Sequence, residues 1–469
     1  MNMRTKGIAA ALLAATALAM PQAAIAQPSL SARLDRLEAE MASLRAELAA
    51  AKAGQAEAIA TAQAAQAASQ ASTAQLAAMQ AQAQPVSAAP AKPADGMRSG
   101  AATIRIGGYI KLLAASTRYS EGEVASNSLG RDFYLPQAIP TGSGPASQVT
   151  DYTAKQSRFW VNLATDVAGH SLKGYLETDF QTAPGTQGSQ RTTNGYNLAL
   201  RRAYLQFDKW TFGQDWTTFQ YTGALPESTD YVGGAEGTVF VRQPLVRYST
   251  PLSKALTLHV ALENPESGTA TVRAPALVEN GDDKLPDLAA RLAWSGTAGE
   301  LSLAGLARQV RTRNAGLAAH AGGFGASAAG KLYLNTDKTG DVRFMATYGR
   351  NIGRYVGLNF APDGVYDPAA NRLASVNVFA ALAAARLPLA TNLRANLMGS
   401  YQSVSYADNL APTSIATFNK RAWSVAGNLF WSPVKNLDLG IEARHGYREL
   451  VNGADGAVNR LEFAAKYGF

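Results

Sequence analysis

From residue 103 onward, apolar and polar residues alternate within short segments of the chain. In the segment 158–166, Phe159, Val161 and Leu163 fall on one face of an extended chain, and the charged residues fall on the other. The segment 172–180 repeats this alternation after only a short Ala-Gly-His-Ser connection. Since a period of two is the repeat of a β-strand, the two segments predict an antiparallel hairpin.

The same pattern continues to the end of the chain and predicts sixteen strands. The predicted strands cover residues 103–117, 156–167, 171–182, 197–208, 210–219, 239–249, 255–264, 287–295, 299–311, 323–335, 340–350, 374–388, 391–406, 419–432, 437–448 and 457–469. Tight connections, such as Asp208-Lys209, alternate with wide ones, such as residues 121–154. Short turns at one end and long loops at the other are typical of a β-barrel that spans a membrane.

The last predicted strand shows the alternation most clearly. From residue 459 to residue 469, the odd positions carry Asn, Leu, Phe, Ala, Tyr and Phe, whereas the even positions include Arg, Glu and Lys. The chain stops on the aromatic residue Phe469. This ending resembles the terminal signal by which bacterial outer-membrane barrels are recognised for assembly. The alternative is a half-buried edge strand of a soluble β-sandwich.

Residues 29–52 follow a different repeat, in which apolar residues recur at alternating steps of three and four. Leu34, Met41 and Leu48 take the a positions of a heptad, and leucines take the d positions. Charges at g face opposite charges at the following e positions, which favours a parallel coiled coil between copies of the chain. The heptads do not distinguish a dimer from a trimer. The Ala-rich continuation predicts either more helix or a disordered Ala/Gln spacer.

The N-terminus has the three parts of a secretory signal peptide. Arg4 and Lys6 precede an uncharged run, and Ala24-Ile25-Ala26 provides the small residues of a cleavage site. The alternative, a membrane anchor, needs a longer apolar run, of about 18 residues or more. The sequence therefore predicts four segments. They are a signal peptide (1–26), a periplasmic coiled-coil and Ala-rich helical extension (27–84), a linker (85–102) and an outer-membrane β-barrel (103–469).

Composition argues against an enzyme. The 469 residues include no cysteine, which excludes disulfides, thiolate metal sites and cysteine nucleophiles. The four histidines are scattered, and neither Gly-x-Ser-x-Gly nor His-Glu-x-x-His occurs. The stretch 323–328 imitates a dinucleotide fingerprint, but no βαβ pattern surrounds it. We therefore expect no catalytic residue, no metal and no cofactor.

Charge gives the barrel its expected selectivity. The net charge of the whole chain is +8, and the segment 103–469 retains an excess of Lys and Arg over Asp and Glu. The positive residues are spread singly over many strands, so a nucleic-acid partner is not expected. Strand alternation turns many of them toward the lumen, where guanidinium groups suit carboxylates and phosphates. The candidate residues that line the pore and bind anions are Arg158, Lys173, Arg202, Arg242, Arg247, Arg308, Arg343 and Arg444.

The loop 220–237 carries three acids and no base. It follows the fifth predicted strand, which is where porins place the loop that folds into the pore. Opposite basic walls, Glu227, Asp230 and Glu236 would create a transverse field at a constriction. The alternative is an exposed acidic loop. Ordinary solvation of the lumen is likewise an alternative explanation for the basic strand residues.

Two arginines in the stretch TVFVRQPLVRYS (238–249) conflict with strict alternation. Arg242 and Arg247 are five positions apart, so a regular strand turns them to opposite faces. Proline in a sheet occurs at edges or bulges, and a bulge resets the facing of the residues that follow it. We therefore predict either a bulge at Gln243-Pro244 that brings both arginines into the lumen, or a position for Arg242 at the pore mouth.

Several of these motifs resemble the DcaP-like porins of Gram-negative bacteria. The motifs are QSRFWV (156–161), RRAYLQFDKWTFGQ (201–214), GQDWTTF (213–219), ALPESTDYVGG (224–234) and VFVRQPLVRYST (239–250). The resemblance implies a trimeric, sixteen-stranded outer-membrane channel with a periplasmic coiled-coil extension and a preference for small anions such as dicarboxylates.

The fold class expected from all these patterns is an all-β transmembrane barrel of about sixteen antiparallel strands, preceded by an α-helical coiled coil. The expected function is a porin for passive diffusion of small solutes, with small organic anions preferred. The expected partners are two further copies of the chain, joined through barrel walls and coiled coil, outer-membrane lipid and anionic solutes. A porin for phosphate or sugars, and a tether between the envelope layers with the barrel as its anchor, remain as alternatives.

Overall fold

The structure of the chain is a computed structural model, and it describes residues 96–126, 128–181, 195–279, 281–314 and 317–469. In this part of the chain, sixteen antiparallel strands close into a barrel, and every predicted strand is present. The predicted signal peptide (1–26), the predicted extension (27–84) and most of the predicted linker lie outside the described residues.

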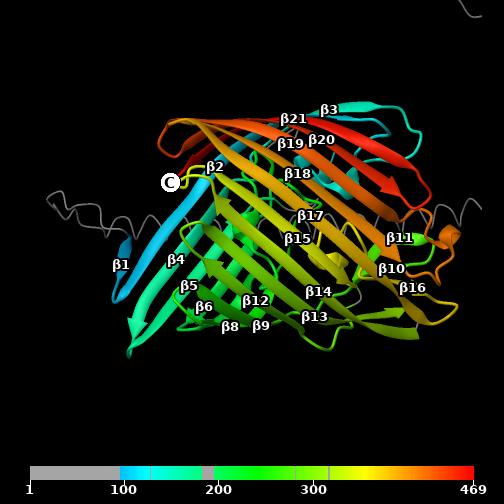
Figure 1. Cartoon of the computed structure of the whole chain (residues 1–469), viewed down its shortest axis with the longest axis horizontal. Coiled ribbons are helices and arrows are strands. Elements are labelled where there is room, and N and C mark those ends of the chain that lie inside the picture. Colours follow the sequence, from blue (N-terminus) through cyan, green and yellow to red (C-terminus); the bar gives the residue numbers. More distant parts are fainter. Residues whose placement is uncertain (1–95, 127, 182–194, 280, 315–316) are drawn as a thin grey trace, which may run out of the picture. The chain divides into compact units, whose positions relative to one another are not determined.

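The barrel strands pair in chain order, and the last of them pairs with the first (Figure 1). They are β2 (Ala102–Tyr119), β4 (Arg158–Val167), β5 (His170–Asp179), β6 (Ala199–Phe207), β7 (Trp210–Trp216), β8 (Arg242–Pro251), β9 (Leu256–Glu263), β12 (Asp287–Ser295), β13 (Gly299–Asn314), β14 (Leu317–Tyr333), β15 (Asp341–Arg350), β17 (Arg372–Ala390), β18 (Leu393–Tyr406), β19 (Asn419–Val434), β20 (Leu437–Leu450) and β21 (Asp455–Gly468).

Alternation along these strands separates an outer apolar face from an inner polar face. In β21, Leu461, Phe463 and Tyr467 are exposed, whereas Arg460 and Glu462 at the alternate positions are buried. Since large apolar side chains exposed in a continuous band are typical of lipid-facing barrel walls, this pattern fits a membrane barrel. Among the described residues, no helix is long and apolar enough to cross a membrane.

Five shorter strands lie beside the barrel strands. They are β1 (Met97–Ser99), β3 (Ser147–Thr153), β10 (Gly268–Thr271), β11 (Ala274–Glu279) and β16 (Gly364–Asp367). β1 folds back on β2 within the predicted linker, and β3 pairs with the second half of β2. The predicted loop 121–154 therefore ends in a strand that sequence analysis missed.

The remaining small strands form a sheet at the long-loop end. β10 pairs antiparallel with β11 and parallel with β16, and β16 pairs antiparallel with the first residues of β17. Figure 1 shows this group toward the end of the barrel opposite the C-terminus. The short helical elements are α2 (Leu129–Asp132), η1 (Pro136–Ala138), η2 (Thr222–Ala224), η3 (Gly353–Tyr355) and η4 (Pro412–Ser414).

The main apolar core lies inside the barrel. Phe219, Tyr355 and Phe360 are almost fully buried there and pack against inward side chains of the wall. These residues come from two loops, 217–241 and 351–371, that fold inward from the long-loop end. The loops therefore fill part of the interior and determine which wall residues remain beside open space.

Candidate functional site

The loop between β7 and β8, residues 217–241, crosses the barrel interior, and we call it the inner loop. Thr229 makes three hydrogen bonds with residues of the barrel wall on β2, β20 and β21. Its hydroxyl donates to Glu462 at 2.8 Å, and its backbone N–H donates to Glu442 at 3.1 Å. Its carbonyl oxygen accepts a hydrogen bond from Lys111 Nζ at 2.5 Å. The tip of the loop is therefore fixed to strands that are distant in sequence.

The inner loop also approaches the wall through its backbone. A Cβ added to Gly237 would lie 2.3 Å from the carbonyl oxygen of Ala381 on β17. This distance leaves no room for a side chain, so only glycine permits the contact. Next to it, the Thr238 carbonyl accepts a hydrogen bond from Gly357 N–H at 3.0 Å. The inner loop is therefore held here by β17 and by the segment that contains Gly357.

The three acids of the inner loop all have partners. Glu227 forms a salt bridge with Arg394 at 2.6 Å. Asp230 is almost fully buried and accepts a hydrogen bond from the backbone N–H of Tyr134 at 3.0 Å. Glu236 is fully buried. The acids thus attach the loop to its surroundings, and two of them are shielded from the lumen.

Glu236 lies among hydroxyl groups. It accepts hydrogen bonds from Tyr134 and Ser400, and from the hydroxyl of Ser424 at 2.9 Å. Burial raises the pKa of Glu236, although the hydrogen bonds from Ser400 and Tyr134 oppose the shift. Burial also raises the pKa of Tyr134, and the nearby Glu236 charge raises it further. Burial of the carboxylate therefore outweighs these hydrogen bonds.

We expect the substitution Glu236→Gln to change the pH dependence of barrel stability. Because the folded-state pKa is raised, the folded protein binds a proton that the unfolded chain has released. The resulting stabilisation is present below the unfolded pKa and is lost as pH rises through the folded pKa. A tenfold difference in proton affinity between the folded and unfolded states corresponds to about 1.4 kcal/mol. Melting temperatures in detergent, measured from about pH 4 to about pH 8, should fall less steeply with rising pH in the variant. Equal slopes in the two proteins would contradict this account.

Three inward arginines on every second strand, β6, β8 and β12, form what we call the arginine wall: Arg202, Arg247 and Arg291. Arg202 Nε lies 2.6 Å from Asp215, and Arg247 Nη1 lies 2.9 Å from the other oxygen of the same carboxylate. Arg291 has no salt bridge among the described residues, and it lies close enough to Arg247 for the like charges to repel. Arg202 also lies 3.6 Å from Glu177, which binds Arg158 as well, so the three cations have two carboxylate partners and Arg291 contacts neither as a salt bridge.

A bulge in β6 orients part of this wall. β5 and β6 pair Glu177 with Arg202 and then Thr178 with Leu200, which leaves Arg201 without a register partner. The extra residue turns adjacent arginines toward acids of the inner face. Arg201 lies 2.7 Å from Asp179, while Arg202 contacts Asp215. Sequence analysis predicted no bulge here, and only the doubled arginine indicated one.

The predicted bulge at Gln243-Pro244 is wrong. β7 and β8 pair without a register shift from Trp210 with Tyr248 to Trp216 with Arg242. Arg242 is the first residue of β8 and lies at the long-loop end, as in the second of our two predictions. Its guanidinium stacks on the Trp216 ring at 3.7 Å. The Arg242 side chain is therefore accommodated by an aromatic ring at the strand end, and no bulge is needed to turn it inward.

The described residues provide no salt bridge for Arg242 or for Lys173, which is exposed on the inner parity of β5. Arg158 binds Glu177 at 2.9 Å and Asp179 at 2.7 Å. Of these three predicted pore residues, one is neutralised by acids and two have no salt bridge within the described residues. Position in the sequence alone therefore does not identify the accessible cations.

The other predicted pore residues are more enclosed. Arg308 and Arg444 have almost no exposed side-chain surface, and each is ion-paired. Arg343 pairs with Asp341 and donates to the carbonyl oxygen of Leu225 in the inner loop. These three arginines hold loops and strands together, and the first two do not face open lumen.

Sequence analysis missed the inward fold of residues 351–371. Phe240 N–H donates to the Tyr355 carbonyl oxygen at 3.0 Å, and Val239 forms an isolated bridge with Val356. The two inward loops therefore support each other. The apolar content of this long connection was the one indication in the sequence that it folds inward. Val356 and Phe360 would be unfavourable in a loop exposed to water, and both are buried here.

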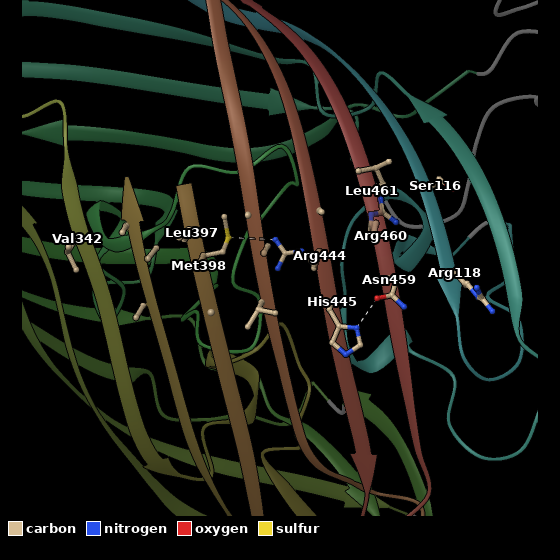
Figure 2. A pocket seen from close by; sticks show the side chains of 18 of the residues that line it. Ser116, Arg118, Val342, Leu397, Met398, Arg444, His445, Asn459, Arg460 and Leu461 are labelled. Atoms are coloured by element: carbon tan, nitrogen blue, oxygen red, sulfur yellow. Dashed lines mark hydrogen bonds between the residues drawn. The ribbon is translucent and has the colours of Figure 1, made fainter. Parts of the chain in front are cut away.

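The outer wall has a groove of about 980 Å³ across β15, β17 to β21 and β2. A register row along it combines small and polar residues. The row is Ala383, Gly399, Val425, His445, Asn459, Arg118 and Gln148. Figure 2 shows His445 and Asn459 reaching toward each other, with 2.9 Å between Nδ1 and Oδ1. This part of the outer face differs from the apolar band around it.

Comparisons with known proteins agree with the geometry. A family model described as DcaP outer membrane protein matches residues 99–469. The outer membrane channel DcaP of Acinetobacter baumannii has a TM-score of 0.65 and 24% identity, over 80% of this chain and 100% of that one. At that identity the likeness shows the fold.

Other solved structures are less similar. OmpT of Vibrio cholerae has a TM-score of 0.47 and 11% identity, over 80% of this chain and 100% of that one. An anion-selective porin from Comamonas acidovorans has a TM-score of 0.48 and 10% identity, over 78% of this chain and 100% of that one. Likenesses this weak carry no argument about function. No curated protein matches the sequence.

Proposed function

Because the chain belongs to the DcaP outer membrane protein family, whose model matches residues 99–469, we propose that its barrel conducts small solutes by passive diffusion and favours small organic anions such as dicarboxylates. Outer-membrane location and membership of a porin family follow from the match and the closed barrel. Anion preference, the natural solute and assembly are the proposed parts.

The arginine wall carries the proposal of anion preference. Arg202, Arg247 and Arg291 present three positive charges, and their carboxylate partners are Asp215 and Glu177, the second of which also pairs with Arg158. A surplus of fixed positive charge attracts anions into a narrow aqueous passage and repels cations. Guanidinium groups on different strands of one wall can also bind two carboxylates of one solute. Phosphate shares this chemistry, so the recordings below include it.

We propose a trimer as the assembled form, with the polar row of the outer groove in the contacts between copies. An arginine on the lipid face is unfavourable, at a cost that falls from about 2–4 kcal/mol at the bilayer midplane to about 0–1 kcal/mol near the membrane surface, so Arg118 near the end of β2 favours a protein contact over acyl chains. Small residues such as Gly399 permit close approach of another wall. The coiled coil predicted for residues 27–84 would join the same copies.

Single-channel recording in planar bilayers under a salt gradient tests the proposal. The expected reversal potential has the sign of anion preference, and succinate and phosphate are expected to interrupt the current. A trimer of channels is expected to close in three equal steps. A cation-selective reversal potential would overturn the anion preference, absence of conductance would overturn the channel, and unitary closures would overturn the trimer. A tether without a channel predicts that second outcome.

A further inference from the structure

A pocket of about 720 Å³ lies at the long-loop end, and we call it the vestibule pocket. Its apolar walls come from segments that are far apart in the sequence. They include Leu135 from the loop after β2, Phe240 from the inner loop, Leu277 from β11 and Leu358 from the second inward loop. An apolar concave site assembled from several loops is typical of a ligand pocket.

Arg448 on β20 is the one ionisable residue among the described residues that line this pocket. Its partners are neutral. Nε donates to Asn419 Oδ1 at 2.8 Å, and Nη1 donates to the carbonyl oxygen of Ile139 at 2.7 Å. The described residues provide no carboxylate within salt-bridge distance and no hydrogen bond for Nη2. The pocket therefore combines apolar walls with one uncompensated positive charge.

The backbone at Leu358 is held in an unfavourable conformation. Gly357, Leu358 and Asn359 have φ angles of 64°, 54° and 69°, so three consecutive residues are left-handed. A leucine rarely adopts this conformation, because its Cβ crowds the backbone. Gln137 Nε2 donates to the Leu358 carbonyl oxygen at 2.7 Å and helps to fix the turn. Such strain persists where the surroundings impose it, often at ligand sites.

Aromatic contacts join the pocket to the interior. Phe240 in the pocket wall packs edge-on against Trp216, with ring centroids 4.9 Å apart. The Arg242 guanidinium lies 3.7 Å from the Trp216 ring and 5.1 Å from the Phe240 ring. A second arginine, Arg242, therefore contacts the Phe240 wall of the pocket.

We propose that the vestibule pocket is an entry site for organic anions that carry a single carboxylate on an apolar body, such as an aromatic ring or a short branched chain. The carboxylate binds Arg448, and the body covers Leu135, Leu277 and Leu358. A second carboxylate would have to leave water against an apolar wall without a cation, which is unfavourable. The inference rests on the proposed channel and adds a solute class beyond dicarboxylates.

Recordings of the full chain in planar bilayers test the site with benzoate, succinate and neutral benzyl alcohol, each added from the long-loop side. Benzoate is expected to interrupt the potassium chloride current at a concentration at least about threefold lower than succinate. Leu277→Ser removes apolar wall and should weaken benzoate about three- to fivefold, because leucine burial contributes roughly in proportion to area. Arg448→Gln should weaken benzoate by about tenfold.

Leu285→Ser is the matched control. Leu285 is an exposed leucine that follows β11 in the sequence, but it does not line the pocket, so benzoate should act on this variant as on the wild type. Equal action of benzoate and succinate, or no effect of Leu277→Ser, would overturn the proposed site. Equal action of benzyl alcohol and benzoate would overturn the role of Arg448. Absence of potassium chloride conductance in the wild type would instead refute the channel itself.

Discussion

Replacing Arg308 by methionine is expected to destabilise the barrel by about 3–5 kcal/mol, because it leaves the buried Asp363 without its cation and leaves Asp287 with only the more distant Arg354. Arg308 lies 2.9 Å from Asp363 and 3.3 Å from Asp287, and none of the three side chains has measurable exposure. It also donates to the carbonyl oxygen of Glu266. One guanidinium thus joins β13 to three other segments, so its loss should also loosen the second inward loop.

Urea unfolding in detergent micelles measures this effect. The variant R308M/D287N/D363N provides the compensated comparison, since it removes both negative charges together with the positive one. Replacing a buried ion pair by neutral groups is often far less harmful than breaking it, so this variant should recover most of the lost stability. Arg372→Met is the control at an exposed arginine and should change stability by less than about 0.5 kcal/mol. A similar loss in R308M and the compensated variant would contradict the electrostatic explanation.

The barrel was predictable because its physical constraints act locally. Lipid on one side and water or polar groups on the other force a period of two on every strand, and the structure contains all sixteen predicted strands. Strands β12 and β15 even begin within one residue of their predicted starts. The period of two can be recognised within each segment, without knowing which segments pair in space.

The interior was less predictable because its contacts join segments far apart in the sequence. The alternation of β13 places Arg308 on the inner side, but it does not show that residues 351–371 fold over it and bury it. The same limitation applies to Glu236, whose acidic character suggested a lumen field although Ser400 and Tyr134 enclose it. The side of the barrel wall that a residue faces can be predicted from its own strand, whereas the burial of its side chain depends on which loops fold back into the barrel.

The sequence pattern also did not predict the small changes in strand register. The proline at 244 suggested a bulge in β8, yet the chain keeps a regular register there and places the bulge in β6 beside Arg201. Pro244 has no N–H to donate, but its carbonyl oxygen still accepts a hydrogen bond from Asn264 N–H at 2.8 Å. Thus the residue type indicated an irregularity, but the neighbouring strands decided where it occurs.

The substitution of all three arginines of the arginine wall, R202Q/R247Q/R291Q, is expected to have the largest effect on ion selectivity. A unit charge about 7 Å from a permeating ion in water contributes about 0.6 kcal/mol, or roughly threefold in local ion concentration. Three charges together should lower the anion-to-cation permeability ratio by about tenfold or more, and Asp215 would remain as a negative charge in the wall.

The reversal potential under a salt gradient measures this change, and its salt dependence identifies the cause. The charge-matched control is R313Q/R350Q/R372Q, which alters three exposed arginines away from the arginine wall. Since charges farther from a solute than the Debye length, about 8 Å at physiological salt, are largely screened, the control should keep the wild-type reversal potential. Equal shifts in the two triple variants would show that net charge, rather than the arginine wall, sets selectivity. Unchanged selectivity in R202Q/R247Q/R291Q would place the selective region elsewhere in the barrel.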